Sequence, residues 1–225
     1  MKCDEKEKAR DAPFQPESPY VIVCEGFQDT GFVCAFLKHL GINNCDVTFP
    51  KTKRDGCDGE SGIPKMVQLV AGIATVEGIA IIRDADMDAD DSFRKACIAF
   101  EKPYDIPDES FVVKKGRHKR TGVFIMPGKG KTGAVEHLLL EAAFTSHPPL
   151  AKCVKELETC NQYSANWSEN KKAKMRMQCV IASFCRANPG CSLGYIWRKG
   201  ADNPLDIASP AFKELADFLT TFSTP

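Results

Sequence analysis

The sequence lacks a long apolar run and an excess of charge of either sign. No apolar stretch approaches the roughly 20 residues that a membrane-spanning helix needs, so we expect no membrane association. The 30 basic and 30 acidic side chains cancel, whereas a generic binder of polyanions would carry a basic excess. Any contact with nucleic acid must therefore come from local patches of positive charge.

The 11 cysteines include no CxxC pair, and the evenly spaced Cys179, Cys185 and Cys191 have no histidine at zinc-site spacing. This pattern predicts reduced thiols and no structural zinc site. The charged N-terminal segment MKCDEKEKARD is not followed by an apolar signal-peptide core. We therefore expect a cytoplasmic protein.

The 225 residues, 43% of them hydrophobic, are enough to build one substantial core. The proline-containing polar stretch 1–18 predicts a flexible lead-in. An α/β core is expected over 19–146, and a mainly helical C-terminal extension packed on the core over 147–225.

Short apolar runs alternate with helix-like segments along the core, a pattern that predicts a Rossmann-like parallel sheet flanked by helices. The expected strands are 20–24, 45–49, 78–82, 111–115 and 121–126. The expected helices run to Leu40 after the first strand and then over 64–76, 92–100, 134–144, 150–160, 171–187 and 210–222. In such a sheet, functional sites lie at the carboxyl ends of the strands.

Acidic residues follow two of these strands directly. Glu25 comes after the first strand, and Asp84 and Asp86 come after the third. Because strand ends meet at one edge of a parallel sheet, the three carboxylates are expected to approach one another. Like charges at close range repel unless a cation lies between them, and hard oxygen ligands favour Mg²⁺ or Mn²⁺.

The aspartates that follow Asp86 have a simpler explanation. Asp88, Asp90 and Asp91 fit a solvated loop and a helix N-cap, since aspartate is a preferred N-cap residue. An EF-hand is excluded, because a loop begun at Asp84 or Asp86 has neither glycine at its sixth position nor glutamate at its twelfth.

The arrangement of a strand with Glu25-Gly26 and a later strand with Asp84-x-Asp86 resembles the Toprim domain. The fuller pattern Glu25-x-x-x-Asp29, Asp84-x-Asp86 and a late glutamate in a glycine-preceded helix is closest to the OLD-type nuclease branch. The resemblance extends over residues 20–144. The helical remainder resembles an uncharacterised bacterial group of small Toprim-like proteins.

The resemblance implies a Mg²⁺ or Mn²⁺ centre and phosphoryl-transfer chemistry. Glu25 would be a metal ligand or the general base, Asp84 and Asp86 would hold metal, and Asp29 would serve a second metal. Glu136 would be the late glutamate of the pattern.

The resemblance also implies a downstream catalytic lysine, for which Lys172 is the candidate. Three of these positions have a structural alternative. Asp29 or Thr30 would cap the first helix, and Glu136 would occupy a first helical turn where the dipole favours an acid. Lys172 would lie on a solvated helix face.

Basic residues gather in two predicted loops. One set lies on a hairpin and comprises Lys114, Lys115, Arg117, Lys119 and Arg120, and the other, Lys129 and Lys131, lies in the glycine loop 127–133. We expect the hairpin beside the acidic site, binding nucleic-acid phosphates, with a solubility-promoting turn as the alternative. The glycine loop fails the P-loop spacing because Ile125 stands where a glycine is required.

The sequence therefore predicts a Mg²⁺- or Mn²⁺-dependent nuclease that hydrolyses DNA or RNA phosphodiesters. The alternative is a non-catalytic or partner-dependent Toprim-like interaction module, working with a separate ATPase or a toxin-system component. OLD-type nucleases commonly carry an ATPase domain, and no Walker motif is found here.

Overall fold

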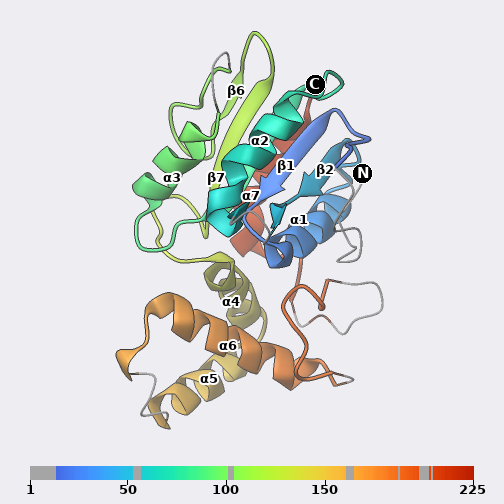
Figure 1. Ribbon diagram of the computed structural model, residues 1–225. Helices are drawn as coiled ribbons and strands as arrows, with labels where there is room; N and C mark the ends of the chain where they lie inside the picture. The colour runs from blue at the N-terminus through green and yellow to red at the C-terminus, as the bar shows by residue number, and fades with distance from the viewer. Residues whose placement is uncertain are drawn as a thin grey trace.

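The structure is a computed structural model that describes residues 14–52, 57–100, 104–160, 165–186, 188–197, 203 and 205–225. Strands and helices alternate through its first half and helices dominate its second (Figure 1). The strands are β1 (Tyr20–Cys24), β2 (Cys45–Thr48), β3 (Lys51–Thr52), β4 (Cys57–Asp58), β5 (Gly78–Asp84), β6 (Val113–Lys115) and β7 (Arg120–Met126). The α-helices are α1 (Phe27–His39), α2 (Ile63–Ala71), α3 (Ala89–Ile98), α4 (Val135–Ser146), α5 (Pro148–Cys160), α6 (Glu169–Phe184) and α7 (Lys213–Ser223).

Five of the strands form the central sheet, in the order β2-β1-β5-β7-β6. All neighbours are parallel except β6, which pairs antiparallel with β7 as the outer arm of the basic hairpin. Cys24 is level with Ile82, and Asp84 is level with Met126, so the carboxyl ends of the three central strands lie at one edge. The predicted α/β class with a mainly parallel sheet is confirmed.

Both faces of the sheet are covered, which explains why its central strands are apolar throughout. Helices α2 and α3 pack on the face presented by Val21, Val23 and Ile81. Helices α1 and α7 pack on the opposite face, presented by Ile22 and Ile82. The result is three layers around two apolar clusters.

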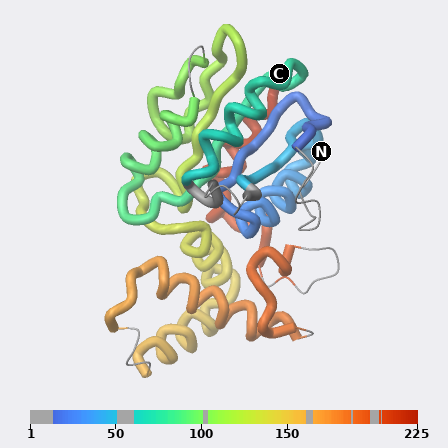
Figure 2. Tube along the Cα trace, viewed as in Figure 1, coloured from blue at the N-terminus to red at the C-terminus, as the bar shows by residue number. Residues whose placement is uncertain are grey.

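Helices α4, α5 and α6 lie beyond the carboxyl edge of the sheet, as the chain trace shows (Figure 2). Helix α7 then returns to the sheet, where Phe218 and Phe222 are buried against the face that also carries Ile22. The segment after residue 147 therefore has two roles: α5 and α6 face the end of the sheet, and α7 covers one of its faces.

The structure revises several predicted boundaries. Strand β5 runs two residues further than expected, so Arg83 and Asp84 belong to the strand itself. Helix α2 ends five residues before the predicted limit, at Ala71. The short pair β3 and β4 lies in a segment predicted as loop, because two-residue strands leave no periodic pattern to recognise.

The predicted lead-in 1–18 lies largely outside the described residues. Its last part is anchored, because the backbone N–H groups of Glu17 and Ser18 donate to Asp46 Oδ2 at 2.5 and 2.9 Å. Asp46 is fully buried on β2, so these bonds fix the entry of the chain into the sheet.

The prediction that all cysteines are reduced thiols is wrong for Cys34 on α1, which is disulfide-bonded. Sequence spacing does not reveal such a bond, because pairing depends on which residues the fold brings together. Eight other cysteines are free thiols. Across the described part of the chain, no helix combines the length and the apolar character needed to cross a membrane.

Candidate functional site

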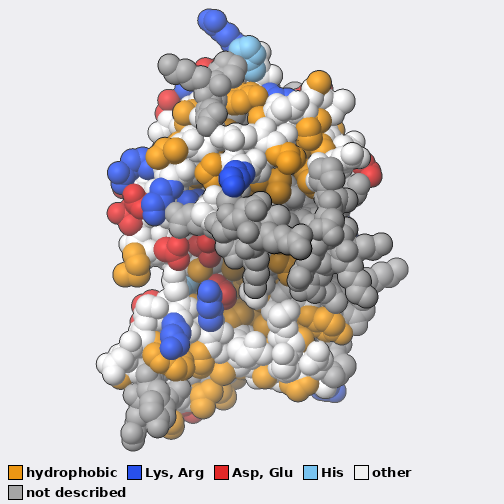
Figure 3. Space-filling view, viewed as in Figure 1, with side chains coloured by type: hydrophobic (Ala, Val, Ile, Leu, Met, Phe, Trp, Pro, Cys, Tyr) orange, Lys and Arg blue, Asp and Glu red, His pale blue; other side chains and the backbone are white. Residues whose placement is uncertain are grey.

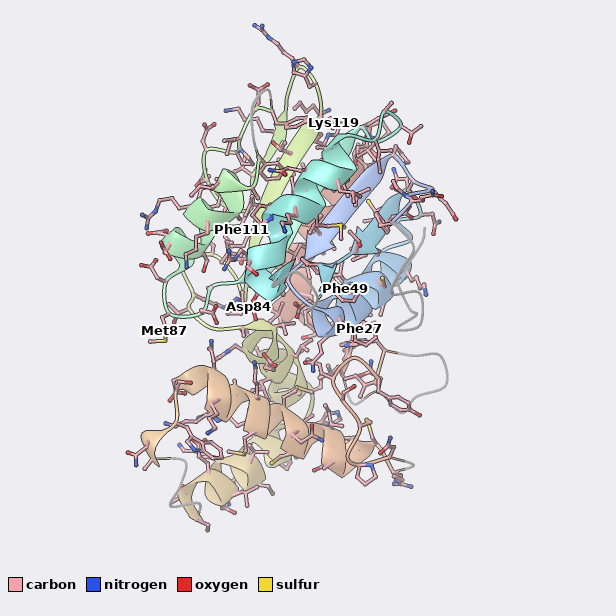
Figure 4. All side chains as sticks on the ribbon, in the orientation of Figure 1. Phe27, Phe49, Asp84, Met87, Phe111 and Lys119 are labelled. Carbon is pink, nitrogen blue, oxygen red and sulfur yellow. The ribbon has the colours of Figure 1, made fainter. Side chains whose placement is uncertain are left out.

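The end of β5 is joined to the start of α4. The backbone N–H of Val135, the first residue of α4, donates to Asp84 Oδ1 at 2.9 Å. This N–H has no partner within the helix, and a carboxylate is favoured at a helix N-terminus by the dipole. The sequence therefore places Asp84 where a strand end and a helix start meet (Figure 4).

Helix α1 directs a second carboxylate to the same place. Gly26, and neither Asp29 nor Thr30, is the N-cap of this helix. Asp29 lies in the first turn, and its Oδ2 accepts from the backbone N–H of Gly26 at 3.0 Å. Asp29 therefore does have the capping role considered for it, although from inside the helix, and it is only 7% exposed.

Glu25 and Glu136 complete the group. Glu25 is partly buried in the two-residue link between β1 and α1. Glu136 is the second residue of α4 and is 5% exposed, and its Oε2 has no hydrogen-bond partner in the described structure. The capping bond at this helix start is made by another residue, since His137 Nδ1 accepts from the N–H of Ala134 at 3.0 Å. Capping therefore does not explain why Glu136 is buried.

These four residues, Glu25, Asp29, Asp84 and Glu136, are called the carboxylate cluster below. Burial, followed by the charges of Glu25 and Glu136, raises the pKa of Asp29 to about 7 despite the bond from Gly26 and the nearby Lys174. Burial and then the charges of Asp29, Glu25 and Glu136 raise the pKa of Asp84 well above its ordinary value. Such mutual repulsion is relieved by a proton or a cation.

Asp86 lies at the rim of the cluster and not within it. Its carboxylate is exposed, and Oδ1 accepts from Asn170 Nδ2 on α6 at 2.8 Å. Its backbone exchanges two hydrogen bonds with Gly133, at 2.7 and 2.8 Å, which tie the β5–α3 loop to the β7–α4 loop. Asp86 is not among the charges that raise the pKa values of Asp29 and Asp84. Its role as a ligand stays a prediction.

The neighbouring acids behave as expected for a helix start. Asp88 is the N-cap of α3, and its Oδ1 accepts from the N–H groups of Asp90 and Asp91 at 3.0 and 2.9 Å. Asp91 is bound in turn by Arg94 and Lys95 on the helix surface.

A second lysine of α6, Lys174, acts electrostatically on the cluster, and the catalytic role of Lys172 stays a prediction. Lys172 Nζ lies 2.9 Å from Glu169 Oε1. The hydrogen bond from Arg176, followed by the charges of Arg176 and Lys172, lowers the pKa of Glu158 on α5. The charge of Lys174 acts on Asp29. Asn170, which reaches Asp86, and Lys174 are four residues apart and therefore share one face of α6. The sequence alone gives no signal that selects Lys174, because the contact between Asn170 and Asp86 is seen only in the folded chain.

The prediction that the basic hairpin lies beside the acidic site is wrong. Arg120 begins β7 level with Gly78, whereas Asp84 is level with Met126 at the other end of the strand. Six residue steps separate these ends, or about 20 Å. Figure 4 shows Lys119 and Asp84 at opposite ends of the sheet. The turn of the hairpin leads into the start of β7. It therefore lies at the amino end of this parallel strand, opposite the edge at which the carboxylates gather.

Two residues of the hairpin have structural roles. Lys119 Nζ donates to the carbonyl oxygens of Ile73 and Val76 in the turn after α2. Arg120 is 8% exposed, donates to the carbonyl oxygens of Phe222 and Thr224, and lies 5.2 Å from the ring centre of Tyr20. Neither side chain is available for phosphate contacts in this arrangement.

The other hairpin cations are at least partly exposed. Lys114 pairs with Asp108 at 2.7 Å, and Lys115 and Arg117 are exposed at the end of the sheet remote from the cluster. Lys129 and Lys131, by contrast, lie in the loop at the carboxyl edge. They form exposed ion pairs, Lys129 with Glu109 at 3.5 Å and Lys131 with Glu141 at 3.0 Å, which weakly restrain them.

The donor set fits a hard divalent cation. In the described part of the chain, no three His, Cys, Asp or Glu side chains already converge with the spacing of a metal site. The cluster nevertheless offers four carboxylates with raised pKa values at two of them, and a buried Glu136 oxygen without a hydrogen-bond donor. Oxygen ligands of this kind suit Mg²⁺ or Mn²⁺.

Comparison with known proteins identifies one family. No curated protein and no solved structure matches the chain. Residues 19–224 match the family described as protein of unknown function (DUF3226), a match that includes the whole sheet, the carboxylate cluster and the helices beyond it. The chain therefore belongs to the DUF3226 family.

Proposed function

We propose that this protein is a Mg²⁺- or Mn²⁺-dependent nuclease that hydrolyses phosphodiesters of DNA or RNA at the carboxylate cluster. The observation that carries the proposal is the gathering of four carboxylates, two buried and two partly buried, at the carboxyl edge of a parallel sheet. One of them, Glu136, has a buried oxygen that no donor satisfies in the described structure. Without a cation or protons, such a group costs stability.

Carboxylates that raise one another's pKa values through burial and mutual repulsion are typical of functional sites. The resemblance of Glu25-Gly26 and Asp84-x-Asp86 to the Toprim domain also supports the proposal and points to phosphoryl transfer. The starts of α1 and α4 further favour negative charge here, because Asp29 and Glu136 both lie in first turns.

The cluster residues would have different roles in catalysis. Asp29, Asp84 and Glu136 would hold the cation, with Glu25 as a further ligand or as the general base that takes the proton from water. When bound, the cation would lower the pKa of a water molecule and neutralise charge on the phosphate. Lys174 would stabilise negative charge that develops on the phosphate oxygens.

The test is cleavage of labelled DNA and RNA oligonucleotides by the purified chain in Mg²⁺, Mn²⁺ or EDTA. The proposal expects cleavage with a cation, none with EDTA, and none with Asp84→Asn. The asparagine can still accept the bond from Val135, so the fold is expected to persist. Asp108→Asn is the matched control, since this aspartate is exposed in an ion pair with Lys114 of the basic hairpin.

Two results would reject the proposal: cleavage that Asp84→Asn retains, or a complete lack of cleavage under all three conditions. In the second case, cation binding by the wild-type chain would direct attention to the non-catalytic, partner-dependent module. Co-purification with a separate ATPase would be the next measurement.

A further inference from the structure

Helix α6 has exposed lysines in its first two turns, and an aromatic residue lies just before its N-cap. Lys174 acts on Asp29 inside the cluster, and Lys171 lies one turn earlier on the helix. Lys171 Nζ lies 4.5 Å from the ring centre of Trp167, which directly precedes the helix cap Ser168. Within the helix, the three residue steps from Lys171 to Lys174 correspond to about 4.5 Å along the axis. We call Trp167, Lys171 and Lys174 the α6 track.

This track supplies what the basic hairpin does not, namely local positive charge beside the acidic site. Figure 3 shows acidic side chains at the lower left of the sheet layer and basic side chains below them on the helices beyond the sheet. Asn170 joins the two sides through its bond to Asp86. Lys171 and Lys174 are both exposed, so they can contact a ligand from solvent.

From this arrangement we infer that the substrate enters as a single strand of nucleic acid lying along α6, with one base stacked on Trp167. The inference rests on the proposed function, because it places the scissile phosphate at the carboxylate cluster. Lys174 and Lys171 would contact successive phosphates.

The aromatic ring is the feature that selects single strands. An unpaired base offers its flat face to an aromatic side chain, whereas in a duplex both faces are already stacked. Trp167 is partly exposed, and the cation that lies over its ring is held only by an exposed interaction worth about 0.5–1 kcal/mol. A base can therefore displace Lys171 from the ring, which frees the ammonium for a phosphate.

The experiment measures binding in EDTA, where no hydrolysis is expected. A fluorescein-labelled 20-nucleotide strand, as DNA and as RNA, is titrated with the wild-type chain and followed by anisotropy. The same strand annealed to its complement is the comparison. Tryptophan fluorescence is recorded with unlabelled strand, because Trp167 is one of only two tryptophans in the chain.

The single strand is expected to bind at least tenfold more tightly than the duplex and to quench tryptophan fluorescence. Trp167→Leu is expected to weaken single-strand binding about tenfold. Trp167→Phe should weaken it less and should abolish most of the quenching. Lys171→Gln should weaken binding, while Arg117→Gln, at an equally exposed cation on the remote hairpin, should leave it unchanged. Thermal melts of the Trp167 variants check that they are folded.

The inference is overturned if the duplex binds as tightly as the single strand, if neither binds, or if folded Trp167→Leu binds within twofold of wild type. These outcomes are separate from the fate of the proposed function. If Trp167→Leu leaves cleavage unaffected, the binding role of the α6 track is rejected and the proposed nuclease activity is retained. If the single strand binds but is not cleaved in Mg²⁺ or Mn²⁺, the binding role of the α6 track is retained and the proposed nuclease activity is rejected.

Discussion

Asp84 at the end of β5 accepts a hydrogen bond from the N–H of Val135 at the start of α4, across 51 residues of sequence. This single contact brings together two of the three chain segments that build the carboxylate cluster. Glu136 follows Val135 directly, so the position of its carboxylate depends on the same helix start. The site is therefore built where strand ends and helix starts meet, with no dedicated binding loop.

Removing one charge from the cluster should stabilise the metal-free protein. Asp84→Asn relieves repulsion by Asp29, Glu25 and Glu136 and keeps an acceptor for Val135. In EDTA at pH 8 we expect a thermal midpoint higher by about 3 °C or more. Mn²⁺ should raise the midpoint of the wild type and not that of the variant. A wild type that Mn²⁺ does not stabilise, or an Asp84→Asn protein that melts earlier in EDTA, would contradict this account.

The stability of the metal-free protein should fall as the pH rises from about 4 to about 7. The folded state holds a proton on Asp29 up to about pH 7, whereas the unfolded state releases it near 3.8. The folded state therefore binds more protons in this window, and the free energy of unfolding decreases as they are lost. Lys174 opposes this effect and Glu25 and Glu136 reinforce it.

Urea unfolding in EDTA at pH 5, 6, 7 and 8 measures this dependence against Asp29→Asn, which can still accept from Gly26. Relative to the variant, the wild type should lose on the order of 1–3 kcal/mol across the series. Parallel curves for the two proteins would show that Asp29 titrates normally.

Substituting Lys172 and Lys174 one at a time distinguishes which of the two lysines contributes to cleavage. Lys174→Gln removes the cation that acts on Asp29, and we expect cleavage to slow about 100-fold. Lys172→Gln is the matched control, because its ammonium pairs with Glu169 on the same helix. A larger loss of cleavage rate in Lys172→Gln than in Lys174→Gln would instead support Lys172, the catalytic lysine expected from the sequence.

Gly133 should not tolerate a side chain. It has φ +124°, and a Cβ there would lie 2.6 Å from His137 Nδ1. Gly133→Ala should cost about 1–3 kcal/mol and loosen the bridge between Gly133 and Asp86. Gly190→Ala is the control, since no atom of the described residues lies within 4 Å of the added Cβ. Equal thermal midpoints for the two variants would contradict the strain at Gly133.

The sequence predicts the sheet well because parallel strands buried on both faces leave apolar runs that are easy to recognise. It also places Glu25 and Asp84 correctly, since residues that follow successive strands meet at one edge. The basic hairpin was expected at the wrong end of the sheet. Which end of a strand a hairpin occupies, and which face of a helix turns toward a site, depend on strand direction and helix packing.

The burial of Glu136 and the role of Asn170 could not be read from the sequence. Glu136 is hidden only because α4 starts against the end of β5, and Asn170 matters only because α6 crosses beyond the sheet. Both contacts are long-range and leave no local pattern. The disulfide at Cys34 is another property that depends on the folded chain.

The most direct test of the carboxylate cluster is titration of the purified chain with Mn²⁺ while the electron paramagnetic resonance signal of free aqueous Mn²⁺ is recorded at pH 8. The account predicts that wild-type protein binds Mn²⁺ and suppresses this signal. Asp84→Asn and Glu136→Gln should bind at least tenfold more weakly, and Asp108→Asn should bind like the wild type. A wild-type chain that leaves the free Mn²⁺ signal unchanged, or cluster variants that bind as tightly as wild type, would contradict the account.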